Sequence, residues 1–473
     1  DGASISNNQF EAYQIFTGDV ADLSGKTVLS NVQWGDDIDS AALLSALKSD
    51  TTLSGSFAAA TTAREVAEAM KDWHDSDEKS IAFARLVYNN KITAKAKPIT
   101  GTSFTAPKAG YYLIVDKTTT STSFNYGAKN FSILEVLDPT SPYTIVSKAV
   151  KPTVEKKVQT NNDLTNPDWG TSADHAVNEP FLFKLTATLP ASAAYKYYNS
   201  YPIDFYDVFT KGITYDGIQS VTATVKGTST LLQDSGAARY TLNTDQLSTS
   251  LTFSLSINNV KAIPGAADAL ADSDVTIDVV YKAHLNENAN CSGSADTTIG
   301  NNNKVSLYYP SNPNEDNAYG NTEPGRTPVS AAYVASYKVE NTKYKDKAET
   351  GNELAGAGFT LYKNKDDTST AITLKLDPTD NYYYPCTGTD TVTEIKSADN
   401  GTFNIKGLDA GTYWLKETTT PTGYNTCEPL EIKITANLSN DTVDLNGSKG
   451  MVNKIVDYSG VVLPSTGGMG TTI

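Results

Sequence analysis

The chain has 473 residues, with 54 acidic and 38 basic side chains and a formal net charge of −16. This length allows about three domains, each with its own core. The acidic balance disfavours nucleic acid or an anionic membrane surface as a partner, and no apolar run is long enough to span a membrane. The first residue is Asp, so we expect a mature exported chain without its signal peptide.

Residues 1–148 mix helix and strand signals. Helical spacing of apolar residues, with Asp or Thr at the start, predicts helices over 38–47 and 62–70. Continuous apolar stretches predict strands over 110–115 and 131–136. We therefore expect an α+β N-terminal domain.

From residue 149 onward the pattern is almost purely β. Alternating apolar and polar residues occur, for example, over 181–189 and 275–281. Such short strands between turn residues are typical of a β-sandwich. A stretch rich in Pro, Asn and Gly before residue 328 indicates a domain edge. We expect a middle sandwich over 149–328, a second one over 329–458 and a tail over 459–473.

Cysteine and histidine are scarce. Cys386 and Cys427 fall in one predicted domain and could pair in an exported protein, although two free thiols are an equal alternative. The cysteine spacings match no zinc site, and no nucleophile elbow or phosphate loop is present. We therefore predict no cofactor, no metal and no enzyme in the usual sense.

Strand alternation places three ionisable or amide side chains on the core face of the middle domain. Lys156 points with the valines on either side of it, and Asp207 points with the flanking phenylalanines. Asn303 shares a face with the apolar residues that follow it.

The last domain repeats this set. Lys343 shares a face with Tyr337, and Glu417 shares one with Tyr413. Asn453 lies near the end of the domain, on a strand with apolar residues on both faces.

Burial shifts both lysine and carboxyl groups towards their neutral forms. A neutral lysine is a nucleophile, and a protonated acid can polarise the asparagine carbonyl and shuttle protons as ammonia leaves. The two trios therefore predict internal Lys–Asn isopeptide bonds, promoted by Asp207 and Glu417. Buried salt bridges, or lysines that reach water, are the alternative.

The last domain resembles a collagen-adhesin B-type domain. The resemblance rests on residues 354–362, which read LAGAGFTLY, and on GTYWLKET at 411–418 followed by PTGY. In that family the glutamate of the second motif is the catalytic acid, which corresponds to Glu417. The lysine lies about ten residues before the first motif, which selects Lys343, with Lys338 as the runner-up.

The other domains resemble those of sortase-assembled backbone pilins of Gram-positive bacteria. The middle domain resembles the second pilin domain through residues 152–158 and 300–307 and through Asp207. The head resembles the N-terminal pilin domain through residues 13–16 and 29–35. The fold class that this resemblance implies is mainly β, with tandem immunoglobulin-like sandwiches after an α+β domain.

A pentapeptide near the end of the chain resembles the LPxTG sorting signal of Gram-positive surface proteins. Its residues are Leu463, Pro464, Ser465, Thr466 and Gly467. In that family a sortase cleaves after the threonine and passes its acyl group to an amine. The apolar span and basic tail that usually follow are missing, so we expect a chain trimmed before its anchor.

A polymer also needs an amine on the next subunit. In backbone pilins this is a lysine between the first and second domains, which makes Lys148 the best candidate and Lys151 the second. The resemblance implies a secreted shaft subunit of a wall-anchored pilus. Its partners would be sortase, identical subunits joined head to tail, tip and base pilins, and peptidoglycan. A wall-anchored or pilus-associated adhesin that binds a host ligand is the alternative.

Overall fold

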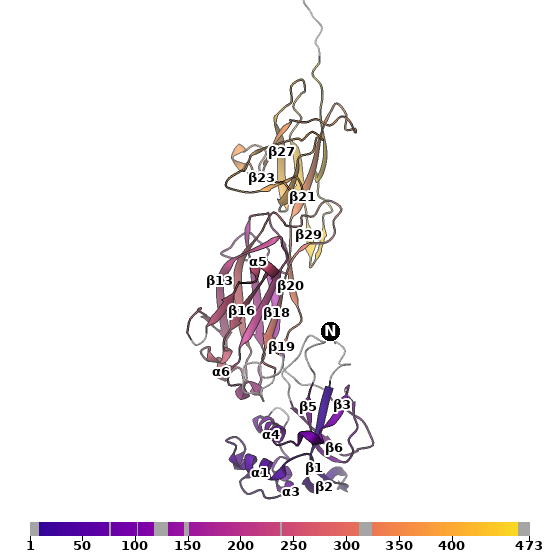
Figure 1. Cartoon of the computed structure of the whole chain (residues 1–473), viewed down its shortest axis with the longest axis vertical. Helices are drawn as coiled ribbons and strands as arrows, with labels where there is room; N and C mark the ends of the chain where they lie inside the picture. Colours follow the sequence, from indigo (N-terminus) through magenta and orange to yellow (C-terminus); the bar gives the residue numbers. More distant parts are fainter. Residues whose placement is uncertain are drawn as a thin grey trace, which may run out of the picture.

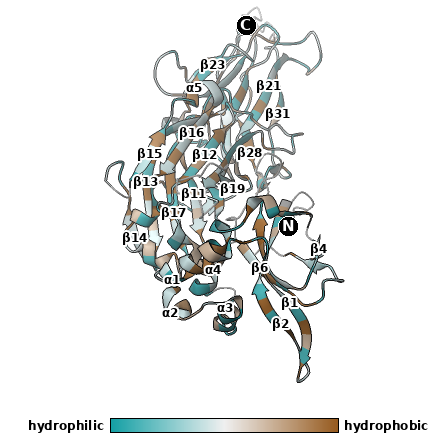
Figure 2. Cartoon of the chain, turned by 60° about the horizontal axis from the view of Figure 1, so that its bottom comes forward, coloured by the Kyte–Doolittle hydropathy of each residue, from teal (hydrophilic) through white to brown (hydrophobic). Residues whose placement is uncertain are grey.

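The computed structural model describes residues 9–74, 77–101, 103–117, 131–145, 151–236, 239–311 and 324–461. The chain is elongated, with the helical N-terminal part at one end, a large β-sandwich in the middle and a second sandwich at the other end (Figure 1). The mainly β class expected from the sequence is confirmed by this arrangement. Along many strands, polar and apolar residues alternate as bands (Figure 2).

The N-terminal domain is a small antiparallel sheet with helices packed against it. The main strand path is β2-β1-β5-β6, and β3 pairs with β1. Local sequence sets the helix starts: the Asp39 side chain caps α1, and Thr62 and Glu65 form a capping box at α3. The predicted helices and strands of this domain are confirmed, whereas helix α4 was missed.

In chain order the elements of this domain are β1 (Gln9–Leu23), β2 (Lys26–Trp34), α1 (Ser40–Ser49), α2 (Ser54–Phe57), α3 (Ala63–Ala69), α4 (Glu78–Asn89), η2 (Thr93–Lys95), β3 (Lys97–Thr100), β4 (Ser103–Phe104), β5 (Gly110–Asp116), β6 (Phe131–Val136) and β7 (Tyr143–Thr144).

The middle domain is a sandwich of two sheets. One has the order β14-β13-β17-β11-β8-β9, and the other β10-β20-β18-β12-β16-β15, with β19 paired to β18. The inward residues of both sheets form one continuous core that includes Phe183, Phe205 and Tyr281. The first strand, β8, contacts β18 and β20 of the opposite sheet, so both sheets meet around it.

The elements of the middle domain are β8 (Thr153–Gln159), β9 (Trp169–Gly170), β10 (Ser172–Asp174), β11 (Pro180–Leu189), η3 (Ala193–Tyr197), β12 (Ile203–Phe209), β13 (Ile213–Val225), β14 (Thr228–Leu231), β15 (Tyr240–Asn243), α5 (Leu247–Ser250), β16 (Thr252–Ile257), η4 (Val260–Ala262), α6 (Ala266–Ala269), β17 (Val275–Leu285), β18 (Asn301–Tyr309), β19 (Gly325–Arg326) and β20 (Ser330–Ala335).

The C-terminal domain is a smaller sandwich. Its sheets have the orders β23-β24-β26-β21-β31 and β25-β22-β27-β28, and β29 pairs with β30 beside them. The first and last strands, β21 and β31, lie next to each other in parallel. This pairing brings residues from the two ends of the domain together.

The elements of this domain are β21 (Tyr337–Lys345), β22 (Gly358–Tyr362), η5 (Thr368–Thr370), β23 (Leu374–Asp377), β24 (Tyr382–Pro385), β25 (Glu394–Lys396), β26 (Asn404–Leu408), β27 (Gly411–Thr419), β28 (Leu430–Ile434), β29 (Asn437–Ser439), β30 (Thr442–Asp444) and β31 (Val452–Asp457).

The boundary between the two sandwiches differs from the expected one at residue 328. Strand β20 pairs with β18 and β10, so residues 330–335 belong to the middle domain. The two domains are hydrogen-bonded where they meet: Val177 N–H donates to the Gly407 carbonyl at 2.9 Å, and Ala410 N–H to Asp174 at 2.6 Å. Gly407 has a positive φ of 82°, and a Cβ there would lie 2.6 Å from a Val177 methyl group.

Among the described residues, no helix has the length and apolar character needed to cross a membrane. Two of the sequence predictions fall outside the described residues. These are Lys148 and the pentapeptide Leu463, Pro464, Ser465, Thr466 and Gly467. The runner-up Lys151 is described and exposed.

Candidate functional site

The middle domain brings the predicted trio together in the core between its two sheets. Lys156 comes from β8 of one sheet, while Asp207 and Asn303 come from the neighbouring strands β12 and β18 of the other. All three residues have an exposed fraction of 0%. Lys156 Nζ donates a hydrogen bond to Asp207 Oδ2.

The trio includes a residue that the sequence analysis missed. Tyr281, on β17, accepts a hydrogen bond from Lys156 Nζ at 2.8 Å and one from Asn303 Nδ2 at 2.5 Å. Its hydroxyl donates to Asp207 Oδ1 at 3.3 Å. In the sequence, only the alternation of apolar and polar residues along β17 indicated that Tyr281 faces the core. That pattern predicted core packing and no role in the site.

Burial shifts both ionisable groups of this site towards their neutral forms. Burial lowers the pKa of Lys156 to about 8 and raises that of Asp207, although the two groups attract each other when charged. Lys156 Nζ also lies 4.9 Å from the centre of the Phe183 ring. Asn303 Oδ1 is buried and has no hydrogen-bond partner among the described residues. A protonated Asp207 would bring a further hydrogen-bond donor to this site.

The C-terminal domain contains a second buried lysine with two acids. Lys343 has an exposed fraction of 0%. Its Nζ donates to Asp457 Oδ1 and lies 3.4 Å from Glu417 Oε1. Glu417 reaches this position from β27 of the opposite sheet, in register with Phe359. The predicted Lys343 and Glu417 are thus brought together.

The predicted Asn453 is not at this site, and its assignment as the partner of Lys343 is wrong. In the parallel pair of β21 and β31, Asn453 lies opposite Asn341 and donates to its side chain at 2.8 Å. Lys343 lies opposite Ile455, so the next inward residue towards the chain end is Asp457. The register of the two strands therefore places Asp457, and not Asn453, beside the Lys343 amine.

Lys338, the runner-up for this lysine, lies on the other face of β21. It is half-buried, and its backbone N–H donates to the Ser292 carbonyl of the middle domain at 3.1 Å. It is therefore not part of the buried group.

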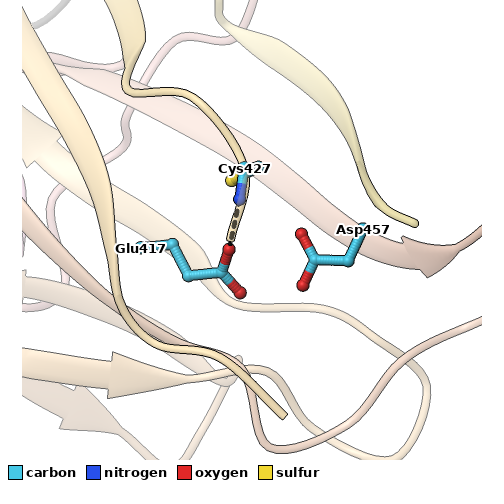
Figure 3. A group of neighbouring side chains, drawn as sticks. All are labelled: Glu417, Cys427 and Asp457. Atoms are coloured by element: carbon cyan, nitrogen blue, oxygen red, sulfur yellow. Dashed lines mark hydrogen bonds between the residues drawn. The ribbon is translucent and has the colours of Figure 1, made fainter. Parts of the chain in front are cut away.

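The carboxyl groups of Glu417 and Asp457 point toward each other (Figure 3). Glu417 Oε1 and Asp457 Oδ2 lack hydrogen-bond partners among the described residues, and one proton shared between the two groups would satisfy both. Burial, reinforced by Glu417, raises the pKa of Asp457 to about 6. The Asp457 carboxyl therefore keeps a proton to a higher pH than an ordinary aspartic acid.

Cys427 completes the surroundings of Glu417. Its backbone N–H donates to Glu417 Oε2 at 2.8 Å (Figure 3). Ligand atoms of Cys427, Glu417 and Asp457 lie within 4.8 Å of one another, a set that could hold a metal ion. Lys343 Nζ already lies within ion-pair distance of both carboxyls. This arrangement suits chemistry between side chains better than metal binding.

Of the two alternatives for Cys386 and Cys427, a disulfide or two free thiols, the structure has the free thiols. Cys386 packs against the core of the middle domain, whereas Cys427 packs against the core of its own domain. The loop that carries Cys386 turns towards the domain junction, which separates the two sulfurs.

Comparison with known proteins gives one family match. Residues 339–449 match the family described as SpaA, a prealbumin-like fold domain. This segment carries Lys343 and Glu417 and ends before Asp457. No curated protein sequence matches the chain.

Several solved structures are similar to the chain. A backbone pilin of Streptococcus pyogenes is 15% identical with a TM-score of 0.49, and the match covers 96% of each chain. The full-length major pilin SpaD of Corynebacterium diphtheriae is 16% identical with a TM-score of 0.46, covering 96% of this chain and 93% of that one. A C-terminal fragment of a major pilin of Streptococcus agalactiae is 19% identical with a TM-score of 0.44, covering 65% of this chain and 99% of the fragment.

Proposed function

We propose that this protein is a structural shaft subunit of a covalently polymerised pilus, strengthened by one internal isopeptide bond in each sandwich. The observation that carries this proposal is the pair of fully buried lysines. Lys156 contacts Asp207 and shares the Tyr281 hydroxyl with Asn303. Lys343 contacts both Glu417 and Asp457. A buried lysine is costly unless it is paired, and conversion to an amide removes its charge permanently.

In the middle domain the bond would join Lys156 to Asn303. The lysine amine attacks the carboxamide carbon, Asp207 polarises the carbonyl and carries protons, and ammonia leaves. Lys156 and Asn303 lie on opposite sheets, so the bond would tie the sandwich across its core.

In the C-terminal domain the bond would join Lys343 to Asp457. Here the amine attacks a carboxylic acid, Glu417 carries protons, and water leaves. Lys343 and Asp457 lie on the adjacent first and last strands of one sheet. The bond would then join the first and last strands of the domain covalently.

Both bonds would protect the chain against pulling. Tension that enters on the first strand of each domain would cross directly to the far strand, and the strands between would carry little load. In the loop-entropy model a cross-link that closes more than about 100 residues stabilises a domain by about 5 kcal/mol. These properties suit a shaft subunit.

Polymerisation would use the pentapeptide. Sortase would cleave after Thr466 and transfer its acyl group to Lys148 of the next subunit, with Lys151 as the second candidate. Identical subunits would be joined head to tail, with tip and base pilins as further partners, and the polymer would be displayed at the cell wall.

Two measurements test the proposal. Peptide mass mapping of the folded chain should find Lys156 joined to Asn303 with loss of ammonia, and Lys343 joined to Asp457 with loss of water. Unmodified peptides at both places would reject the internal bonds. Expressing cells should show high-mass ladders that disappear with Lys148→Ala and persist with the matched control Lys151→Ala. Ladders that survive Lys148→Ala would reject that lysine.

A further inference from the structure

The hydroxyl of Tyr281 lies between two nitrogen atoms of the proposed reaction in the middle domain, the one that would bond to the Asn303 carbonyl carbon and the one that would leave it. It is 2.8 Å from Lys156 Nζ, the attacking atom, and 2.5 Å from Asn303 Nδ2, the leaving atom. It also reaches Asp207 Oδ1 at 3.3 Å. One hydroxyl group thus contacts every other member of the site.

Packing alone does not explain this position. The ring of Tyr281 is held by aromatic neighbours, with Phe253 at 5.2 Å and Phe183 at 5.5 Å between ring centres. A phenylalanine ring would make the same contacts. Tyr309 of the same core is also buried, yet its hydroxyl has no hydrogen-bond partner among the described residues. A buried tyrosine in this domain does not by itself bridge polar groups.

We propose that Tyr281 is a catalytic residue of the cross-linking reaction and relays a proton from the lysine nitrogen to the departing amide nitrogen. This inference rests on the proposed Lys156–Asn303 bond. It adds a fourth participant to the lysine, the acid and the asparagine.

The step balances as follows. Neutral Lys156 attacks the carboxamide carbon of Asn303, and the new C–N bond forms with two protons on the lysine nitrogen. One of these protons passes to the Tyr281 oxygen while the phenolic proton passes to Nδ2. The old C–N bond then breaks, and ammonia leaves. Tyr281 ends neutral, and the lysine nitrogen keeps the single proton of an amide.

The local environment suits a neutral relay. Burial, together with the nearby Asp207 carboxyl, raises the pKa of the Tyr281 hydroxyl well above its ordinary value. The phenol therefore keeps its proton and works as donor and acceptor at once. Asp207 remains free to polarise the carbonyl oxygen, so the two tasks fall to two groups.

The test compares Tyr281→Phe with Tyr309→Phe. Chain recovered unfolded from inclusion bodies is diluted into refolding buffer, and the cross-linked Lys156–Asn303 peptide is followed over time by mass spectrometry. Folding is followed in parallel by circular dichroism. Loss of a general acid–base group slows a reaction by about 10²–10⁴-fold, so Tyr281→Phe should fold normally and cross-link at least about 100 times more slowly. Tyr309→Phe should cross-link at the wild-type rate.

A Tyr281→Phe chain that folds and cross-links as fast as wild type overturns the inference. If this variant does not fold, a fluorinated tyrosine at position 281 decides the question, since it keeps the shape and the hydroxyl but makes the hydroxyl more acidic. A changed rate supports the relay, and an unchanged rate rejects it. The outcomes stay distinct from those of the proposed function, because a wild-type chain without the cross-link rejects the bond itself.

Discussion

The middle and C-terminal domains each bury a lysine beside an acid, but the residues of the two groups come from different parts of a sandwich. In the middle domain, Lys156 faces its acid and its asparagine across the core, from one sheet to the other. In the C-terminal domain, Lys343 and Asp457 lie on adjacent strands of one sheet, and only Glu417 comes from the opposite sheet. In both domains the proposed bond would therefore join an early strand to a late one, although the two strands lie in different sheets in the middle domain and in one sheet in the C-terminal domain.

The two proposed reactions also differ in their leaving group. An asparagine releases ammonia, whereas an aspartic acid releases water only when it is protonated. The middle site has a hydroxyl, that of Tyr281, between the nitrogens. The C-terminal site has two carboxyls that face each other (Figure 3). These differences predict different responses to mutation and pH.

The largest expected effect comes from removing the acyl partner. Asn303→Ala and Asp457→Ala should each abolish one cross-link and lower the stability of that domain by about 5 kcal/mol. For domains of this size the loss corresponds to a fall in unfolding temperature of roughly 10–20 °C, measurable by calorimetry.

Asn453→Ala is the matched control for the C-terminal domain. It removes a buried asparagine from the same strand but should leave the Lys343–Asp457 peptide intact in mass mapping. Loss of the cross-link in this variant would restore Asn453 as the partner and contradict the strand register.

The second effect concerns the acids. Asp207→Asn and Glu417→Gln keep the shape of each side chain but remove its ability to carry a proton. Each change should slow the cross-link of its own domain by about 10²–10⁴-fold and leave the other domain unchanged. Refolding time courses with peptide mapping measure both bonds in one sample. Normal cross-linking in Glu417→Gln would show that Lys343 and Asp457 react without it.

The third prediction is an opposite pH dependence of the two reactions. Lys156 has a lowered pKa of about 8, so its reactive neutral form increases as pH rises through this value, and the middle bond should form faster. Asp457 has a raised pKa of about 6, so its protonated form decreases above this value, and the C-terminal bond should form more slowly. Refolding at a series of pH values measures both rates, with circular dichroism as the control for folding. Parallel profiles would contradict the assignment of the two leaving groups.

The sequence was sufficient to predict most of the polar side chains that meet inside the two sandwiches, because alternation along a strand fixes which side chains face the core. Lys156, Asp207 and Asn303 follow directly from it. Alternation cannot fix the register between two strands, however. Asn453 and Asp457 share one face of β31, and only the pairing with β21 shows which of them lies beside Lys343.

The other points that the sequence did not settle have similar causes. The boundary at residue 328 was placed by local composition, but β20 is recruited to the middle sheet by hydrogen bonds to β18. The choice between a Cys386–Cys427 disulfide and two free thiols stayed open, because local sequence does not show that Cys386 packs on the neighbouring domain. In each case a long-range contact decided what local sequence could not.

The smallest expected effect is that of Cys427→Ala in the C-terminal site. It contrasts with the large effect expected for Tyr281→Phe in the middle site. The Cys427 backbone N–H holds Glu417 at 2.8 Å, and Cys427→Ala keeps this donor. Burial raises the pKa of the thiol to about 12, so the sulfur stays protonated and is a poor nucleophile. Losing a weak thiol hydrogen bond costs about 1 kcal/mol or less, so the C-terminal cross-link should slow by less than about tenfold.

The same refolding time course checks this prediction, with Cys386→Ala as the control for loss of a thiol outside the site. A slowing as large as that expected for Tyr281→Phe would mean that the thiol itself takes part in the reaction. A small effect would instead place the proton transfer of the C-terminal domain on its two carboxyls. The hydroxyl relay would then belong to the middle domain alone, where ammonia must leave from an amide nitrogen that needs a proton.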